Sequence, residues 1–255
     1  DPAAQAPQIA RNLAQLARIT EEVQRTAMSM RMIPLEGLFQ RMVRLVRDLG
    51  RKSGKKAQLD VSGEEVELDR NIVEELGDPL MHMIRNAMDH GIEPPQLRQE
   101  AGKAPVGRLE LKAFHRAGQI VIQVRDDGRG LDRERIMAKA RAKGIIGESA
   151  TLTDSEIVNL IFEPGFSTAE QVSDISGRGV GMDVVRKQIQ KLRGTIEVRS
   201  TPGHGTEFSL RLPLTMAIID GLVVTVGAER FIVPIFAVKE LLRPKPEMVS
   251  TVEGS

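Results

Sequence analysis

Residues 80–90 combine apolar and polar side chains at the spacing of an amphipathic helix, and this segment constrains the fold more than any other. Each residue of an α-helix advances by about 100°, so the two kinds of side chain fall on opposite arcs. The apolar arc comprises Leu80, Met81, Met83, Ile84, Ala87 and Met88, and the polar arc comprises His82, Arg85, Asn86, Asp89 and His90. Asp78-Pro79 predicts the start of this helix and Gly91 its end. We therefore expect the helix to dock by its apolar side.

Two of the four histidines of the chain lie on the polar face of this helix, which raises the question of a metal site. His82 and His90 are about 12 Å apart along the helix axis, because the rise per residue is about 1.5 Å. Histidines that share one zinc ion on a helix are typically spaced i, i+4. The pair therefore does not predict a shared zinc ion, and the face by itself is typical of solvated surface.

The remaining sequence predicts further helices. A seam of apolar residues at spacings of three and four predicts a long helix that needs a partner helix. A capping box formed by Thr153 and Glu156 predicts the start of a shorter helix. The expected helices span 9–32, ended by Ile33-Pro34, then 35–49, followed by a turn over 50–54, and then 133–143, 153–162 and 181–194.

Segments that alternate with period two predict strands between these helices. The expected strands are a short one at 58–62, a β-hairpin over 108–126, and two more at 195–200 and 206–213. After Pro213 the sequence changes to short apolar segments separated by Gly227-Ala228. We interpret residues 214–255 as the start of a separate β domain that is cut short.

Composition excludes several classes of protein. A chain of 255 residues with 41% hydrophobic and 28% charged residues is typical of a folded, soluble protein. The absence of cysteine excludes disulfides, thiolate catalysis and a cysteine zinc site. A net charge of +1 and an aromatic content of 3% give no case for nucleic acid. No apolar run approaches membrane-spanning length and no signal peptide opens the chain, so we expect a cytoplasmic location without membrane insertion.

Two glycine-rich motifs are candidates for ligand binding. DDGRGLD, at 126–132, directly follows a predicted strand, and as a bare pattern it is equally typical of a turn. In a binding site, Asp126 would point a carboxylate at an exocyclic amine such as that of adenine, while Gly128 and Gly130 would let the backbone approach the ligand. GRGVGMD, at 177–183, leads into a predicted helix N-terminus, which suits phosphate groups. It fits neither a P-loop nor a dinucleotide fingerprint.

The order of these motifs resembles the GHKL ATP-binding family of histidine kinases, gyrase-type ATPases, the Hsp90 class and MutL. In that resemblance the chain carries five boxes in sequence, which are His82–His90 (N), Asp126–Gly130 (G1), Phe162–Phe166 (F), Gly177–Gly181 (G2) and Gly205-Thr206 (G3). The stretches HMIRNAMDHGIE, DDGRGLD, IFEPGFST and GRGVGMDVV are most similar to the chemotaxis branch of the histidine kinases. The ATPase branches normally place a glutamate at the position of His82.

The resemblance implies an α+β fold, a two-layer sandwich with a mixed, largely antiparallel sheet and helices on one face. A long helix would precede this sandwich, and the first strands of a β-barrel domain would follow it. The implied domains are a partial dimerisation hairpin at 1–32, a catalytic domain at 33–213 and the start of a CheW-like regulatory domain at 214–255.

The resemblance also implies the residues of a Mg-ATP site. His82, Arg85 and Asn86 would be catalytic, and Asn86 would hold Mg²⁺, an ion that takes few protein ligands. The expected ATP-binding residues are His82, Asn86, His90, Asp126, Gly128, Gly130, Lys139, Lys143, Ser167, Thr168, Gly177, Arg178, Gly179, Val180, Gly181, Met182 and Thr206. For Lys139 and Lys143, at i and i+4 of one helix, solvated surface is an equally good interpretation.

The implied reaction is transfer of the γ-phosphoryl group of ATP to a histidine on a separate phosphotransfer domain of the same kinase, in trans within a homodimer. The implied partners are a CheW-like coupling protein, chemoreceptors and downstream response regulators. Residues 1–81 contain no histidine, which fits an acceptor on another domain. An ATPase or a nucleotide-binding scaffold without catalysis are the alternatives.

Overall fold

The computed structural model describes residues 2–166, 181–214, 221–234, 238, 240 and 241. The chain divides into two compact units, Asp1–Met216 and Ala217–Ser255. In the second unit, β8 (Gly221–Val226) and β9 (Glu229–Pro234) pair as an antiparallel hairpin. This hairpin agrees with the strands expected there, and the assignment of 214–255 to a regulatory domain stays a prediction.

A sheet of five strands, in the order β2-β4-β5-β7-β6, forms the centre of the first unit. The strands are β2 (Ala57–Ser62), β4 (Gly107–Arg116), β5 (Gln119–Asp126), β6 (Thr195–Thr201) and β7 (Gly205–Pro213). β2 and β4 run parallel, and the other neighbours run antiparallel. The predicted mixed, largely antiparallel sheet is confirmed, and so is the hairpin of β4 and β5.

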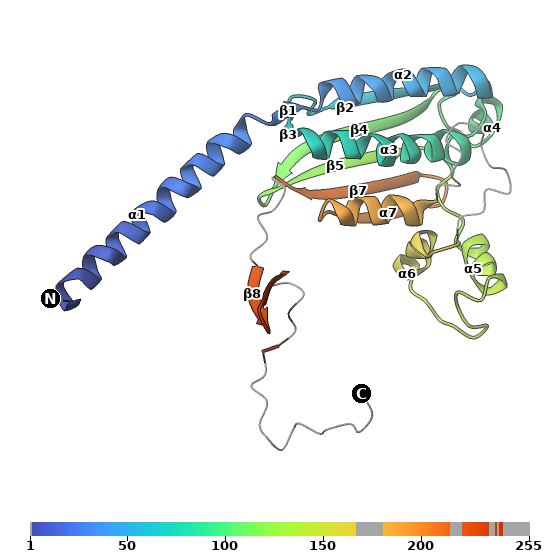
Figure 1. The fold of residues 1–255 in the computed structure, drawn as a ribbon. Coiled ribbons are helices and arrows are strands. Elements are labelled where there is room, and N and C mark those ends of the chain that lie inside the picture. Colours follow the sequence, from blue (N-terminus) through green and yellow to red (C-terminus); the bar gives the residue numbers. More distant parts are fainter. Residues whose placement is uncertain (1, 167–180, 215–220, 235–237, 239, 242–255) are drawn as a thin grey trace, which may run out of the picture. The chain divides into compact units, whose positions relative to one another are not determined.

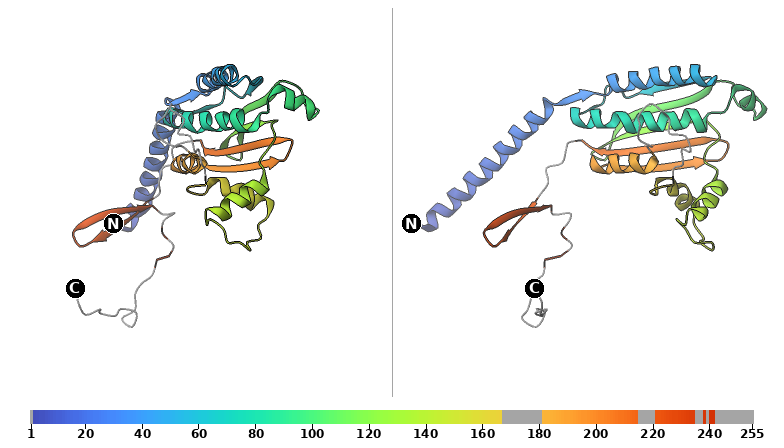
Figure 2. Two further views of the ribbon diagram at one scale, coloured as in Figure 1. Left: turned by 90° about the vertical axis from the view of Figure 1, so that its right-hand side faces the viewer. Right: turned by 45° about the vertical axis from the view of Figure 1, so that its right-hand side comes forward.

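Three helices cover one face of this sheet, as Figures 1 and 2 show. They are α2 (Glu36–Ser53), α3 (Arg70–Asn86) and α7 (Met182–Lys191). Leu111, Ile122 and Leu210 are fully buried in the sheet. Lys112, Arg125 and Arg199 alternate with such buried positions along their strands and are exposed. A strand points successive side chains to opposite faces, so this alternation matches a sheet with one covered face, and the predicted two-layer fold is confirmed.

The long helix α1 and several shorter elements complete the first unit. They are α1 (Pro2–Ser29), β1 (Met32–Pro34), β3 (Glu67–Asp69), the π-helical turn η1 (Ala87–Gly91), α4 (Pro95–Glu100), α5 (Arg133–Ala142), α6 (Asp154–Asn159) and the 3₁₀ turn η2 (Leu160–Phe162). The capping box of Thr153 and Glu156 opens α6, as predicted. Leu13, Leu16 and Val23 of the predicted α1 seam are exposed.

The predicted helix start at Asp78-Pro79 is wrong. α3 begins at Arg70, and the carboxylate of Asp69 caps it by accepting the Asn71 N–H at 2.9 Å. Pro79 is buried inside the helix. Proline lacks an N–H and removes one hydrogen bond of the helical ladder. Apolar side chains on both sides of Pro79 are buried against the core, and such packing outweighs local propensity.

Two other predicted boundaries also differ from the structure. α1 ends at Ser29 rather than at 32, because Met32–Pro34 form strand β1 and pair with β3. α2 continues through the turn expected over 50–54 and ends only at Gly54, whose φ is 69°. A left-handed residue at this position is the common end of a helix, and Gly50 is simply an interior residue of α2.

The cap of α3 gives the first prediction. Asp69→Ala is expected to lower the free energy of unfolding by about 1–2 kcal/mol, because α3 then begins with an unsatisfied N–H. Asp69→Asn keeps a side-chain acceptor and serves as the matched control, with a change of a few tenths of a kcal/mol. Urea unfolding followed by circular dichroism measures both. Asp69 also forms an ion pair with Arg31, whose NH2 lies 3.3 Å from Asp69 Oδ1. Equal losses for the two variants would show that this ion pair, rather than the cap, is what Asp69 contributes.

Candidate functional site

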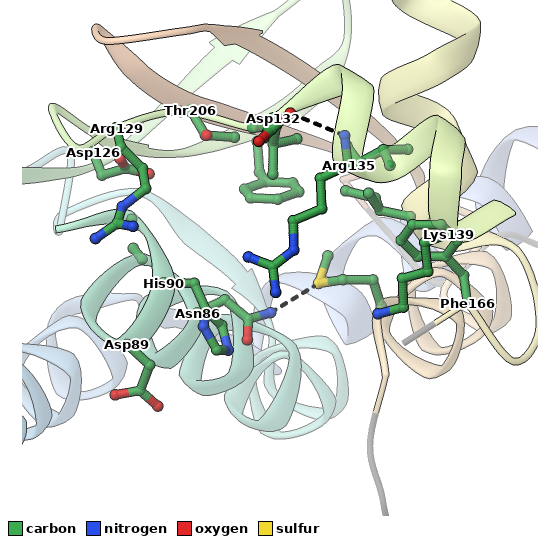
Figure 3. Close-up of a pocket in the computed structure, with 18 residues that line it drawn as sticks. Asn86, Asp89, His90, Asp126, Arg129, Asp132, Arg135, Lys139, Phe166 and Thr206 are labelled. Carbon is green, nitrogen blue, oxygen red and sulfur yellow. Dashed lines mark hydrogen bonds between the residues drawn. The ribbon is translucent and has the colours of Figure 1, made fainter. Parts of the chain in front are cut away.

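A cavity of ≈ 440 Å³ lies where the polar side of the α3–η1 helix faces α5, the N-terminus of α7 and the loop after β5 (Figure 3). It is lined by Asn86, Ala87, Asp89, His90, Gly91, Asp126, Arg129, Gly130, Leu131, Asp132, Arg135, Ile136, Lys139, Ile161, Phe166, Met182, Thr206 and Phe208. Elements far apart in the sequence therefore converge on one concave site. Its volume lies within the range of small-molecule pockets.

Asp126 is the buried carboxylate of this cavity, with only 4% of its surface exposed. It is the last residue of β5, and its Oδ1 accepts the backbone N–H of Gly128 at 2.9 Å. Ser200 on β6 supports the same end of the site. Its hydroxyl accepts the Leu131 N–H at 2.8 Å and lies 3.1 Å from the Thr206 hydroxyl. The sheet therefore fixes Asp126 and Thr206, two of the expected binding residues, on one wall.

Glycine is required at two positions around this carboxylate. A Cβ at Gly128 would lie 2.3 Å from the carbonyl group of Gly91, so the loop after β5 and the end of η1 meet backbone to backbone. Gly205 has a φ of 103°, and a Cβ there would lie 1.9 Å from the Asp126 carbonyl oxygen. Only glycine allows these approaches, so the glycines of both motifs close the wall behind Asp126. Gly128 supports the cavity in this way without lining it.

Burial raises the pKa of Asp126 to about 6, and the neighbouring carboxylates of Asp127 and Glu93 act in the same direction. The backbone N–H groups of Gly128 and Thr206 partly oppose this rise by hydrogen bonding. The carboxyl is thus desolvated and short of partners when it is ionised. A ligand that donates a hydrogen bond, such as an exocyclic amine, would supply what the folded protein lacks.

The helix that carries the polar face contributes Asn86, Asp89 and His90 to the cavity. Its last turn is π-helical, and the Lys55 ammonium donates to the carbonyls of Met88 and Asp89 at 2.7 Å each. The Asn86 Nδ2 donates to the Met182 sulfur at 3.2 Å, which links the helix to the N-terminus of α7. A π turn re-aims the side chains that follow it, so this irregularity shapes the wall.

His82 and Arg85 are half-buried on the same helix and are not among the residues that line the cavity. Burial lowers the pKa of His82, and the charge of Arg85 lowers it further. His82 is therefore neutral at physiological pH. The structure brings Asn86 and His90 together at the cavity and leaves the other two expected residues beside it.

Two cations of α5, Arg135 and Lys139, line the cavity, whereas the expected pair was Lys139 and Lys143. Lys139 lines the cavity as predicted, and its ammonium also lies 5.1 Å from the centre of the Phe166 ring. Lys143 is not a lining residue, because its ammonium donates to the backbone carbonyls of Gly165 and Phe166. Arg135, one turn before Lys139, takes the second place and points toward Asn86 (Figure 3). This residue was missed, although the i, i+4 spacing to Lys139 carries the signal.

Of the other expected binding residues, Gly130, Met182 and Thr206 line the cavity, whereas Gly181 caps α7 without lining it. Six others lie outside the described residues, namely Ser167, Thr168, Gly177, Arg178, Gly179 and Val180. Sequence reasoning missed Arg129, Asp132 and an apolar group of Leu131, Ile136, Ile161, Phe166 and Phe208. A sequence pattern assigns such apolar residues to the hydrophobic core, and only the fold shows that this apolar group surrounds a cavity.

Within the described part of the chain, no group of three or more His, Asp or Glu side chains is arranged to hold a metal ion. Asn86 offers one neutral amide beside the cations of α5. This donor set suits an ion that takes most of its ligands from phosphate and water, as Mg²⁺ does with nucleotides. It does not suit a metal held by protein alone.

A two-layer α/β sandwich with a buried carboxylate at one end of an apolar cavity, and cations at the other, defines a nucleotide-binding domain. Residues 75–216 match the family described as histidine kinase-, DNA gyrase B- and HSP90-like ATPases. These residues include α5, Asp126 and all but the first turn of α3. The chain belongs to this family, which confirms the resemblance stated from its five sequence boxes.

The chain is also similar to proteins called "Chemotaxis protein CheA". That of Salmonella typhimurium is 50% identical over 243 residues, which cover 95% of this chain and 36% of that protein. That of Bacillus subtilis is 46% identical over 227 residues, which cover 88% and 34%. The chain thus spans about one third of the length of these curated relatives.

Among solved structures, the catalytic domain of histidine kinase ThkA is similar to this chain, with a TM-score of 0.45 and 17% identity. It covers 72% of this chain and 95% of that one. No described helix combines the length and the apolar character needed to cross a membrane.

The raised pKa of Asp126 gives the second prediction, on the pH dependence of stability. The ordinary pKa of an aspartate is 3.8, and that of Asp126 in the folded protein is about 6. Between these two pH values Asp126 is mostly protonated in the folded state and mostly ionised in the unfolded state. The stabilising contribution is therefore fully present below the lower value and is lost as the pH rises through the higher one. The full cost of ionisation is about 3 kcal/mol. Asp126→Asn carries no such cost.

We expect the stability of Asp126→Asn relative to the parent chain to rise by about 3 kcal/mol from about pH 4 to about pH 8 without nucleotide. Urea unfolding at a series of pH values measures this difference, and other titrating groups cancel because both chains share them. A stability difference that does not change with pH would show that Asp126 has an ordinary pKa.

Proposed function

We propose that this chain is the catalytic core of a chemotaxis-type histidine kinase, which binds Mg-ATP and transfers its γ-phosphoryl group to a histidine on a separate phosphotransfer domain. The observation that carries the proposal is the arrangement of charged side chains in the cavity, with a carboxylate on one wall and cations on another. The buried carboxylate of Asp126 lies on the sheet wall, whereas Arg135 and Lys139 enter from α5. The similarity to the chemotaxis proteins supports the kind of kinase.

In this proposal the adenine lies among the apolar lining residues with its exocyclic amine on Asp126. Ile136, Met182 and Phe208 supply apolar surface for a flat base. The triphosphate extends toward Arg135 and Lys139, whose positive charges balance its negative charge. Arg129, beside Asp126, and His90, on the helix that carries Asn86, also line the cavity and would add polar contacts for the ribose and phosphates. When Mg²⁺ is bound, it neutralises phosphate charge and orients the leaving group, and Asn86 is the residue that would hold it.

The reaction would be an in-line displacement at the γ-phosphorus. The bond from phosphorus to the bridging oxygen breaks, a bond from phosphorus to an imidazole nitrogen forms, ADP leaves, and the imidazole loses its N–H proton. A neutral imidazole already has a lone pair, so the protein mainly positions groups and neutralises charge. His82, neutral because its pKa is lowered, would orient groups or accept a proton beside the phosphates.

The proposed partners follow from the kind of kinase. They are the phosphotransfer domain of the same protein acting in trans within a homodimer, a CheW-like coupling protein, chemoreceptors and response regulators. A cytoplasmic location, beside receptors at the membrane in the longer protein, belongs to the same proposal. The competing ATPase function would need a residue that activates water. The ATPase branches normally carry a glutamate four residues before the asparagine, and this chain has His82 there.

The metal assignment gives the third prediction. Asn86→Ala is expected to abolish the increase in ATP affinity that magnesium produces, because the neutral amide is the proposed protein ligand. Titration calorimetry with and without magnesium measures the two affinities, and an unchanged circular dichroism spectrum controls for folding. Asn159→Ala, on α6 and away from the cavity, is the matched control. Magnesium dependence that survives in Asn86→Ala would remove this residue from the metal site.

The acceptor gives the fourth prediction. The chain is expected not to label itself with the γ-phosphate of ATP, because His90 lines the cavity, His82 is half-buried beside it, and His115 and His204 lie near a strand end and in a turn. An added His-phosphotransfer domain should be labelled slowly, since nothing tethers the two proteins. Incubation with labelled ATP, followed by acid and base treatment, should give an acid-labile, base-stable bond. Acid-stable label on the chain alone, or phosphate release at the same rate without an acceptor, would contradict the proposal.

A further inference from the structure

A buried ion network lies directly behind the loop that carries Asp126. The Arg98 side chain, 1% exposed, forms a fork to the Asp127 carboxylate, with NH1–Oδ1 and NH2–Oδ2 distances of 3.0 and 2.8 Å. The same guanidinium donates to Glu93 at 3.2 Å and, through Nε, to the Ala104 carbonyl at 2.7 Å. A planar fork of this kind holds a carboxylate in one orientation, so Arg98 fixes the residue next to Asp126.

Lys103 extends this network onto the backbone of the loop. Its ammonium donates to the Glu93 carboxylate at 2.8 Å and to the carbonyls of Asp127 and Gly128 at 3.0 and 2.8 Å. Burial alone would raise the pKa of Glu93, but the hydrogen bond from Lys103 holds it below its ordinary value. The Glu93 carboxylate thus lies between two cations, Arg98 and Lys103, and the backbone carbonyls of two consecutive loop residues, Asp127 and Gly128, accept hydrogen bonds from Lys103.

The network joins the two walls that meet at Asp126. Glu93, Arg98 and Lys103 belong to the segment that follows η1, whereas Asp127 and Gly128 belong to the loop after β5. The walls touch where Gly128 meets the carbonyl group of Gly91, and a Cβ at Gly128 would lie 2.3 Å from that carbonyl. Asp127 is also tied to β4, since its Oδ1 accepts the Arg108 N–H at 2.9 Å. Buried ion pairs are costly to desolvate and are weak sources of stability, so such a network is better explained by the geometry it imposes.

We propose that Arg98 and Lys103 are positioning residues for base recognition, which fix the loop so that the Asp126 carboxylate meets the exocyclic amine of adenine. This inference rests on the proposed ATP site. It assigns a task to two cations that do not line the cavity and contact no reacting group. The network therefore sets the selectivity between adenine and a purine without the amine, and the phosphate contacts of α5 are independent of it.

The test compares ATP with purine riboside triphosphate, which lacks only the amino group. Titration calorimetry at about pH 8, where Asp126 is ionised, gives the ratio of the two dissociation constants. Contacts to the phosphates and the fraction of folded protein cancel in this ratio. For the parent chain we expect a preference for ATP of roughly 10- to 100-fold, the size of one hydrogen bond to a charged group.

Lys103→Met removes the ammonium from a partly exposed side chain and is expected to lower the preference by at least about threefold, because small misplacements weaken directional contacts. Arg98→Lys keeps the buried charge but loses the fork, and it should act in the same direction. Lys191→Met and Arg211→Lys change surface ion pairs of α7 and β7 and should leave the preference unchanged.

The outcomes separate the two proposals. A parent chain that binds both triphosphates equally would overturn the adenine contact of Asp126, and the role of the network with it. A parent chain that prefers ATP, together with Lys103→Met and Arg98→Lys variants that keep the full preference while binding either triphosphate, would overturn the positioning role alone. Loss of folding in Arg98→Lys leaves Lys103→Met to decide between these results.

Discussion

The burial of one carboxylate, that of Asp126, is the constraint on which the rest of the site depends. The side chain is held by a strand end, two backbone N–H groups and a wall that closes only because Gly128, which meets the Gly91 carbonyl group, has no side chain. Its raised pKa records the cost of this arrangement, which a nucleotide amine would offset. The glycine motifs and the ion network fix the loop next to this group, and the Ser200 hydroxyl holds the same loop at Leu131 and lies 3.1 Å from the Thr206 hydroxyl.

The two ends of the cavity are built differently, and the proposed function gives a reason for this difference. The proposed base end is formed by the sheet and by backbone contacts, so its geometry is fixed. The proposed phosphate end is formed by long side chains of α5 and by a helix whose last turn is π-helical. Lys139, over the Phe166 ring, and Lys143, on the adjacent carbonyls, link α5 to the F box. Rigid recognition of the base and adaptable contacts to phosphate would suit the proposed reaction, in which ADP must leave after each transfer.

Much of the fold could be predicted from local patterns. The β4–β5 hairpin, α5, the capping box of α6 and the last two strands of the sheet follow from period, caps and turn residues. The start of α3 could not be predicted, because Pro79 imitates a first helical residue. Burial on both sides of it, a tertiary effect, decides the outcome. Strand β1 was likewise missed, since three residues gain strand character only by pairing with β3.

The site shows the same division between local and tertiary information. Asn86, His90 and Asp126, which motifs carry, and Lys139, which the spacing on a basic helix suggested, all line the cavity. Arg135 was missed in favour of Lys143, since a helical pattern gives the spacing of two cations but not which pair faces the cavity. Nothing in the sequence indicated that Arg98 and Lys103 have a role near the site, because arginine and lysine are common on ordinary protein surfaces. Their role depends on the fold bringing residues 93–104 against the loop after β5.

A crystal structure of this chain with Mg²⁺ and a non-hydrolysable ATP analogue tests the central claim most directly. The account predicts the exocyclic amine of adenine within hydrogen-bond distance of the Asp126 carboxylate, the phosphates between Arg135 and Lys139, and the metal ion on Asn86. An adenine bound away from Asp126, or a triphosphate that runs in the opposite direction through the cavity, would contradict it.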